Sequence, residues 1–193
     1  MNQEKLIKFF TDSGFVNMQA AVDISSRFKE HNFSKNDFLL EEGKIADTYL
    51  FLASGLMRAF AFDTEGNEVT TAFYSQGNVV FEVSSFFTRI RSKENIQAIT
   101  DCKGWSINYQ ELNDLFHNLP AFREFGRNIL VKGFTALKSR TLSMITETAE
   151  QRYQYLVHTH PEIFQYAALK HIASYLGVTD SSLSRIRKEL SAR

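Results

Sequence analysis

Residues 169–190 combine apolar spacing and a central glycine in a way that few local structures accommodate. Ile172 and Leu176 are four residues apart, so they share one face of a first short helix. Gly177 follows, where a sharp turn needs a positive φ angle, and Thr179 is a suitable N-cap for a second helix. The apolar stripe of that second helix is Leu183, Ile186 and Leu190. The spacing predicts a helix-turn-helix.

The opposite face of the second helix is polar and partly cationic. Short hydroxyls and long cations on one helix face suit entry into a DNA major groove, where they reach base edges and phosphates. We expect DNA contacts from Thr179, Ser181, Ser182, Ser184, Arg185 and Lys188, and phosphate or flanking contacts from Lys170, His171 and Arg187. An ordinary helical hairpin with a solvated polar face is the alternative.

Charge is distributed unevenly along the chain, although the formal net charge is zero. Residues 1–117 hold 11 Lys and Arg against 16 Asp and Glu, a net charge of −5. Residues 118–193 hold 11 against 6, a net charge of +5. The basic part therefore contains the helix-turn-helix, as expected of a segment that binds nucleic acid.

Turn residues separate short runs of aromatic and β-branched residues from about residue 38 onward. The runs are 38–40, 48–53, 56–62, 69–74, 79–81 and 95–99. Their spacing of about ten residues predicts an antiparallel β-roll or jelly roll. Short helices over residues 2–10 and about 16–30 precede the roll, which makes the fold class α+β.

A long helix is predicted from Pro120 to about Glu147, because proline suits a first helical turn and apolar residues then recur every three or four positions. These seam positions are Phe122, Phe125, Ile129, Gly133, Leu137, Arg140 and Met144. The helix either lies across its own roll or forms a two-stranded dimer contact, and we favour the dimer. The expected domains are a sensor roll (1–119), a connecting helix (120–147) and the DNA-binding part (148–193).

The single Cys102 excludes an intrachain disulfide and a multi-cysteine metal site, which fits a reducing cytoplasm. No signal peptide precedes the first helix and no apolar run is long enough to span a bilayer, so we expect a cytoplasmic protein without a membrane partner. His158 and His160 have a spacing that metal ligands can have, but we expect no completed ligand set and no metal.

The order of an acidic β-roll, a long helix and a C-terminal helix-turn-helix resembles the Crp/Fnr family of transcription regulators, the relatives of the cyclic AMP receptor protein. The resemblance rests on Gly43, Gly55, Gly66, Gly77, residues 57–63 and residues 170–190. It implies a homodimer through residues 120–147 that binds near-palindromic double-stranded DNA and responds to a small-molecule effector held in the roll. It also implies RNA polymerase as a partner of an activator, although no stretch of the sequence identifies a surface for it.

The ligand loop departs from the family pattern, in which Gly-Glu is followed about ten residues later by Arg-Ser or Arg-Ala. In the family the glutamate binds the ribose hydroxyl and the arginine pairs with the cyclic phosphate. Here Phe81 replaces the glycine before Glu82, and Arg91 and Ser92 are about one residue out of register. These four residues are the candidate ligand pocket. We expect a degenerate cassette that binds another small molecule or nothing, with a cyclic nucleotide the less favoured ligand and no certain cofactor.

Two further departures concern DNA. Asp180 and Ser181 stand where the family often has Arg-Glu or Pro-Glu, so we expect a different target sequence. Only three residues follow Leu190, so we expect no β-hairpin wing. Fewer phosphate contacts should give a shallower salt dependence, because log K falls by about 0.9 per neutralised phosphate per decade of salt.

The leading hypothesis is therefore a dimeric, sequence-specific transcription regulator of the Crp/Fnr type, controlled by an unknown effector or by none. The alternative is a small-molecule-binding β-roll protein whose C-terminal helices mediate protein contacts. An enzyme is not expected, because the roll offers only His31 and His117, near its ends, as metal-ligating histidines.

Overall fold

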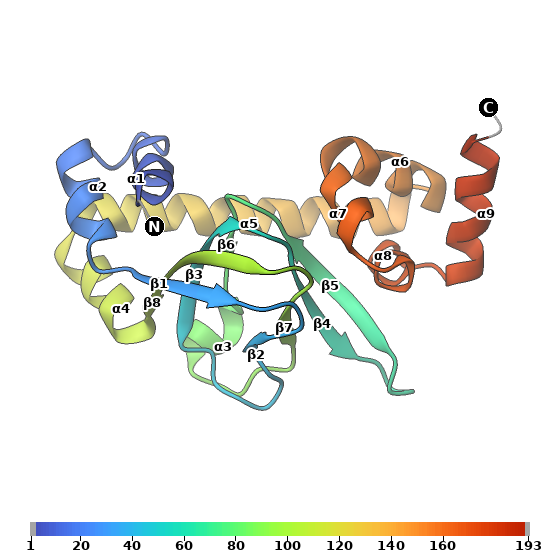
Figure 1. The fold of residues 1–193 in the computed structure, drawn as a ribbon, viewed down its shortest axis with the longest axis horizontal. Coiled ribbons are helices and arrows are strands. Elements are labelled where there is room, and N and C mark those ends of the chain that lie inside the picture. Colours follow the sequence, from blue (N-terminus) through green and yellow to red (C-terminus); the bar gives the residue numbers. More distant parts are fainter. Residues whose placement is uncertain (1–2, 192–193) are drawn as a thin grey trace.

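The computed structural model describes residues 3–191, which form a β-roll with a helical cap, a long helix and a C-terminal group of short helices (Figure 1). The cap consists of α1 (Glu4–Thr11) and α2 (Met18–Ser25). Residue 2, the expected first residue of the first helix, lies outside the described residues. The second helix ends at Ser25 rather than near residue 30, because the chain there joins a sheet.

The roll is made of two four-stranded antiparallel sheets. One has the order β1-β8-β3-β6 and the other β2-β7-β4-β5. The strands are β1 (Lys29–Phe33), β2 (Phe38–Leu40), β3 (Thr48–Ser54), β4 (Met57–Phe62), β5 (Glu68–Tyr74), β6 (Val79–Val80), β7 (Asn95–Ala98) and β8 (Cys102–Asn108). Buried apolar residues of both sheets and of the cap form one core, which includes Leu50, Met57, Ile96 and Trp105. The antiparallel roll predicted from the sequence is confirmed.

Strands β1 and β8 and one short helix of the roll were not among the predicted elements. Strand β8 pairs with both β1 and β3, so it lies inside its sheet even though Lys103 and Gly104 look like turn residues. A Cβ atom at Gly104 would lie 2.2 Å from the carbonyl oxygen of Phe51, which is why only glycine fits there. The short helix α3 (Val83–Thr88) occupies the loop that follows Glu82.

Helix α5 (Pro120–Thr146) runs from the helical cap past the roll to the C-terminal helices, as Figure 1 shows. It follows α4 (Tyr109–Asn118). After it come α6 (Ala149–Thr159), α7 (Pro161–Tyr166), α8 (Leu169–Leu176) and α9 (Asp180–Ser191). The sequence did not predict α7, which begins at a proline in its first turn.

The predicted seam of α5 is divided between two sides of the molecule. Phe122 and Phe125 are buried in the core of the roll. Arg140 and Met144 instead contact the C-terminal helices of the same chain, at Tyr175 and Gly177. Of the predicted seam only Leu137 and Met144 are exposed large apolar side chains, and they lie near one end of it, so these positions are not one continuous stripe.

Candidate nucleic-acid interface and ligand pocket

Helices α8 and α9 form the helix-turn-helix geometry predicted for residues 169–190. Gly177 ends α8 in the left-handed conformation, with φ of 69°. The Thr179 hydroxyl accepts a hydrogen bond from the Ser182 amide (3.2 Å) and so caps α9. Ala173 and Leu183 are buried where the two helices meet. Local residues therefore determine both the turn and the start of the second helix.

Two arginines from neighbouring helices hold this turn in place. Arg152 of α6 donates two hydrogen bonds to the carbonyl oxygen of Leu176 (3.2 and 2.9 Å). Arg140 of α5 donates to the carbonyl oxygen of Tyr175 (3.0 Å) and stacks on its ring. Both carbonyls belong to the last turn of α8, whose acceptors lack partners within the helix. Neither role was predicted, since both arginines are distant in sequence from the turn.

The outer face of α9 is open to solvent. Of the residues predicted to contact DNA, the exposed ones are Lys170, Thr179, Ser181, Ser184, Arg185, Arg187 and Lys188. Ser182 is half-buried beside the Thr179 cap. The structure thus brings Ser181, Ser184, Arg185 and Lys188 together on one helix, opposite the buried Leu183 and Ile186.

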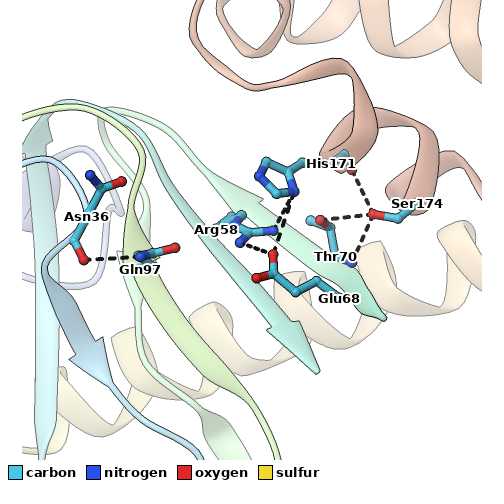
Figure 2. Close-up of polar contacts among 7 residues, drawn as sticks. All are labelled: Asn36, Arg58, Glu68, Thr70, Gln97, His171 and Ser174. Carbon is cyan, nitrogen blue, oxygen red and sulfur yellow. Dashed lines mark hydrogen bonds and ion pairs between the residues drawn. The ribbon is translucent and has the colours of Figure 1, made fainter. Parts of the chain in front are cut away.

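His171 does not face outward, contrary to its expected role as a flanking contact. Figure 2 shows it directed from α8 toward the β4–β5 hairpin of the roll. The guanidinium of Arg58 lies 2.6 Å from His171 Nδ1 and also pairs with the carboxylate of Glu68. The His171 ring is 3.9 Å from that carboxylate. A cation, an anion and an imidazole therefore meet between two parts of the chain that are far apart in sequence.

A second polar contact lies beside this cluster. The Thr70 amide donates to the Ser174 hydroxyl (3.1 Å), and the two hydroxyls are 3.1 Å apart (Figure 2). The Thr70 amide is directed at α8 next to a β-bulge. The strand register shows the bulge, since Phe60 pairs with Thr70 while Ala59 pairs with Ala72. Thr71 is the extra residue, and it reverses the alternation of faces along β5. Glu68, Thr70 and Phe73 consequently share the face that meets α8.

The side chain of Arg58 lies over Phe60 of its own strand, β4, and reaches Glu68 on the neighbouring strand, β5. Its guanidinium carbon is 4.1 Å from the centre of the Phe60 ring, and only 3% of the residue is exposed. A charge buried to this degree costs free energy unless it is paired and hydrogen-bonded. Glu68 and His171 supply the partners, so the packing of α8 on the roll satisfies Arg58.

The surroundings shift the pKa values of both titratable partners of Arg58, His171 and Glu68. Burial, aided by the positive charge of Arg58, lowers the pKa of His171 to about 4. His171 is therefore neutral near pH 7, and its Nδ1 accepts the Arg58 hydrogen bond. Burial works to raise the pKa of Glu68, but the hydrogen bond and charge of Arg58 outweigh it and hold this pKa below its ordinary value. Glu68 is thus ionised.

A groove of about 730 Å³ separates the hairpin from the start of α9. Asp63, Asn67 and Glu68 line it from the hairpin. Lys170, Thr179 and Asp180 line it from the helix-turn-helix. The groove therefore has carboxylates on both walls, next to two residues predicted to contact DNA.

The predicted ligand-pocket residues are engaged in structural contacts. The carboxylate of Glu82 accepts hydrogen bonds from the amides of Ser84 (2.9 Å) and Ser85 (2.6 Å), so it caps α3. Arg91 is exposed and donates to the carbonyl oxygen of Gly43 (2.6 Å). Ser92 is buried and bonds within its own loop, to Glu94. The cation and the carboxylate that a cyclic nucleotide would require are both committed elsewhere.

The interior near Glu82 is also aromatic and acidic. Phe81 is buried and packs against the rings of Tyr49 and Phe86. Burial raises the pKa of Glu94, and the negative charge of Glu82 adds to this shift. A buried phosphate needs a matched cation or backbone donors. These residues do not fit a cyclic nucleotide.

Helix α5 carries exposed apolar side chains on the face turned away from the roll. They are Leu130, Val131, Phe134, Leu137, Leu142 and Ile145, and Phe134 is 70% exposed. A groove of about 460 Å³ beside them is lined by Phe116, Arg123, Arg127, Leu130, Val131 and Phe134. Among the exposed apolar side chains, Leu130, Phe134 and Leu137 are spaced by four and three residues, the spacing of a helix–helix contact.

His160 Nδ1 lies 3.5 Å from the carboxylate of Glu162. Within residues 3–191 no group of three or more His, Cys, Asp and Glu side chains is arranged to hold a metal ion. None of the helices in that range is both long enough and apolar enough to cross a bilayer.

Residues 30–118 match the cyclic nucleotide-binding domain family. Most of the chain is also similar in fold to several solved structures. FixK2 from Bradyrhizobium japonicum has a TM-score of 0.72 and 17% identity, covering 86% of this chain and 85% of that one. A putative Crp/Fnr-family regulator from Eubacterium rectale has a TM-score of 0.72 and 14% identity, covering 96% and 88%.

A CooA variant from Carboxydothermus hydrogenoformans has a TM-score of 0.70 and 16% identity, and the match covers 97% of this chain and 84% of that one. No curated protein sequence matches the chain. At such low identities the similarity concerns the fold, including the order of roll, long helix and C-terminal helices.

Proposed function

We propose that this chain, whose fold is that of the Crp/Fnr regulators and whose residues 30–118 match the cyclic nucleotide-binding domain, is a dimeric, sequence-specific DNA-binding transcription regulator. The observation that carries the proposal is the outer face of α9. Ser181, Ser184, Arg185 and Lys188 are all exposed there, on a helix capped by Thr179 and anchored by Leu183. The net charge of +5 over residues 118–193 supports it.

Arg185 is the residue we assign to base reading. Its guanidinium can bond to O6 and N7 of a guanine in the major groove, a contact that contributes about 1–3 kcal/mol of discrimination. Ser181, Ser184 and Lys188 would contact neighbouring bases or phosphates, with Ser182, Arg187 and Lys170 at the flanks. Asp180 at the start of α9 would disfavour a phosphate at that point, which supports a distinct target sequence.

The partner in the dimer is a second copy of this chain, contacting through residues 120–147. The support is the exposed apolar stripe of α5, which includes Leu130, Phe134 and Ile145. A two-fold dimer would present its two α9 helices to half-sites about 34–36 Å apart. RNA polymerase would be a further partner if the protein activates transcription.

The effector we propose is a small molecule other than a cyclic nucleotide, or none. Glu82 caps α3 and Arg91 is bonded to Gly43, so neither is free for ribose or phosphate. An effector or partner protein that favours one arrangement of α5 and the helix-turn-helix would re-space the two recognition helices by shifting populations.

The test is a selection of DNA from a random library by the purified protein at moderate salt, with and without cyclic AMP. We expect enrichment of a palindrome that does not depend on the nucleotide. Arg185→Ala should abolish that enrichment and leave the circular dichroism spectrum unchanged. Arg27→Ala is the matched control, because Arg27 is also an exposed arginine but lies beside α2 on the roll. Equal enrichment by wild type and Arg185→Ala would refute the assignment of Arg185.

Selection of no sequence, with affinity at the non-specific level of about 10⁻⁴–10⁻⁶ M, would refute DNA recognition itself. That outcome would favour a small-molecule-binding roll whose C-terminal helices contact protein. Enrichment only in the presence of cyclic AMP would instead refute the proposed exclusion of cyclic nucleotides.

A further inference from the structure

We propose that Arg58, Glu68 and His171, together with Thr70 and Ser174, form a latch that holds the helix-turn-helix against the roll in an arrangement unfavourable for DNA. The name "latch" refers to these five residues. The inference rests on the proposed DNA-binding function and adds a device that regulates it.

The latch connects two units that have separate cores. One hydrophobic cluster contains the roll, its cap and the start of α5. The other contains the C-terminal helices and only a few residues of the roll, among them Leu56 and Phe73. Phe73 meets Tyr175 ring to ring at 5.2 Å. Undocking would expose this small apolar contact but would leave the core of the roll closed.

The polar bonds between Arg58 and His171 and between Thr70 and Ser174 cross between these units. Arg58 and His171 are 113 residues apart, and Thr70 and Ser174 are 104 apart. A buried ion pair adds little stability compared with apolar residues of the same size, but removal of one partner is costly. The latch therefore determines where α8 docks, since Arg58 is fully paired only when His171 is in place.

The docked arrangement places negative charge beside the surface that would receive DNA. Asp63 and Glu68 of the hairpin face Lys170 and Thr179 across one groove. A DNA phosphate that approached the start of α9 at Thr179 would enter this groove and meet those carboxylates. Like charges at close range repel, so moving the hairpin away from α9 should strengthen DNA binding.

The first test compares two substitutions with the same change of charge on the same hairpin. Glu68→Gln weakens the latch by removing the anion that pairs with Arg58. Glu65→Gln removes an exposed carboxylate, which neither lines the groove nor contacts α8 in an observed bond. We expect Glu68→Gln to tighten binding to the selected DNA at least about fivefold and Glu65→Gln to change it much less. Equal effects, or no effect of Glu68→Gln, would overturn the latch.

The second test fixes the docked state covalently. Thr70→Cys and Ser174→Cys replace hydroxyls that are 3.1 Å apart, in a background where Cys102→Ser removes the native thiol. The oxidised protein should form this disulfide and bind DNA at least about fivefold more weakly than the same protein after reduction. Failure of the disulfide to form in the folded protein, or equal affinity in both redox states, would contradict the proposal.

The two proposals fail in distinguishable ways. Specific DNA binding that is indifferent to Glu68→Gln and to the disulfide would remove the latch and retain the regulator. Absence of specific binding by the wild type, by Glu68→Gln and by the reduced cysteine variant would remove the regulator.

Discussion

The guanidinium of Arg58 and the imidazole of His171 meet at 2.6 Å across 113 residues of sequence, one from a strand of the roll and the other from the first helix of the helix-turn-helix. Because of this contact, the docking of the helix-turn-helix on the roll depends on the protonation state of His171. It also gives the chain an internal connection between the roll and the helix-turn-helix that does not pass through the long helix.

Docking should weaken as the pH falls from about 6.5 toward 4. The docked His171 has a pKa of about 4, below the ordinary value of 6.5, so the undocked state binds the proton more readily. Linkage then favours docking above pH 6.5 and removes that preference as the pH falls through this window. Other groups that act on the ring are Arg58, Glu68, Lys170 and Asp180.

The measurement is the rate of disulfide formation between cysteines at positions 70 and 174 as a function of pH, corrected for thiolate fraction. We expect slower formation at pH 5 than at pH 7. His171→Gln, which does not titrate, should show no such difference. A pH dependence that survives in His171→Gln would assign it to another group.

Arg152→Ala should destabilise the protein by about 1–3 kcal/mol. The substitution removes two charged hydrogen bonds to the Leu176 carbonyl oxygen, which then loses both of these donors. Urea denaturation measures the change. Arg127→Ala is the control, since Arg127 pairs with Glu124 on the exposed side of α5 and such pairs contribute about 0–1 kcal/mol. Equal destabilisation by both substitutions would argue against the role of Arg152 at the turn.

Gly177→Ala should cost stability for two separable reasons. The φ of 69° disfavours any Cβ by about 1–2 kcal/mol, and that Cβ would also lie 2.4 Å from the Met144 side chain. Met144→Ala in the same protein should recover the steric part and leave the backbone part. A double-mutant cycle followed by thermal unfolding checks this, and complete additivity would show that Met144 does not contribute.

Phe134→Glu should convert the proposed dimer into a monomer, because it places a charge in the exposed apolar stripe of α5, where Phe134 is 70% exposed. Sedimentation velocity measures the change in mass. Lys132→Glu, an exposed position on the same helix turn, is the control for added negative charge. A wild-type protein that sediments as a monomer would refute the dimer directly.

Cyclic AMP should leave the melting temperature unchanged. A ligand present at 100 times its Kd would stabilise the protein by about 2.7 kcal/mol, a shift that thermal unfolding detects easily. We expect none at millimolar nucleotide because Arg91 is exposed and bonded to Gly43. A clear upward shift that Arg91→Ala abolishes would mean that Arg91 reaches the phosphate.

Local signals explain what could be predicted from the sequence. The helix-turn-helix follows from Gly177, the Thr179 cap and the apolar stripe on α9, all within one short segment. The start of α5 likewise follows from Pro120. Strand β8 was missed because its partners, β1 and β3, decide its conformation, while Gly104 favours a turn when considered alone.

The latch could not be predicted for a related reason. Arg58 is a cation within an otherwise apolar strand, which was a visible signal of a buried partner. Its partners lie on another strand and on a distant helix, and the bulge at Thr71 decides which side chains of β5 face them. A pattern of period two would have given the wrong face beyond the bulge.

Residues 131–139, in the middle of α5, are all exposed, so the length of this span sets the rotation of α8 relative to the roll, and the latch then fixes the docked position. Each residue of an α-helix adds about 100° of rotation and 1.5 Å of length. One inserted residue in this span would therefore turn α8 away from Arg58. An insertion of seven, close to two full turns, would restore the orientation but lengthen the arm by about 10 Å. The number of residues in the exposed segment of α5 therefore decides whether α8 and Arg58 can meet.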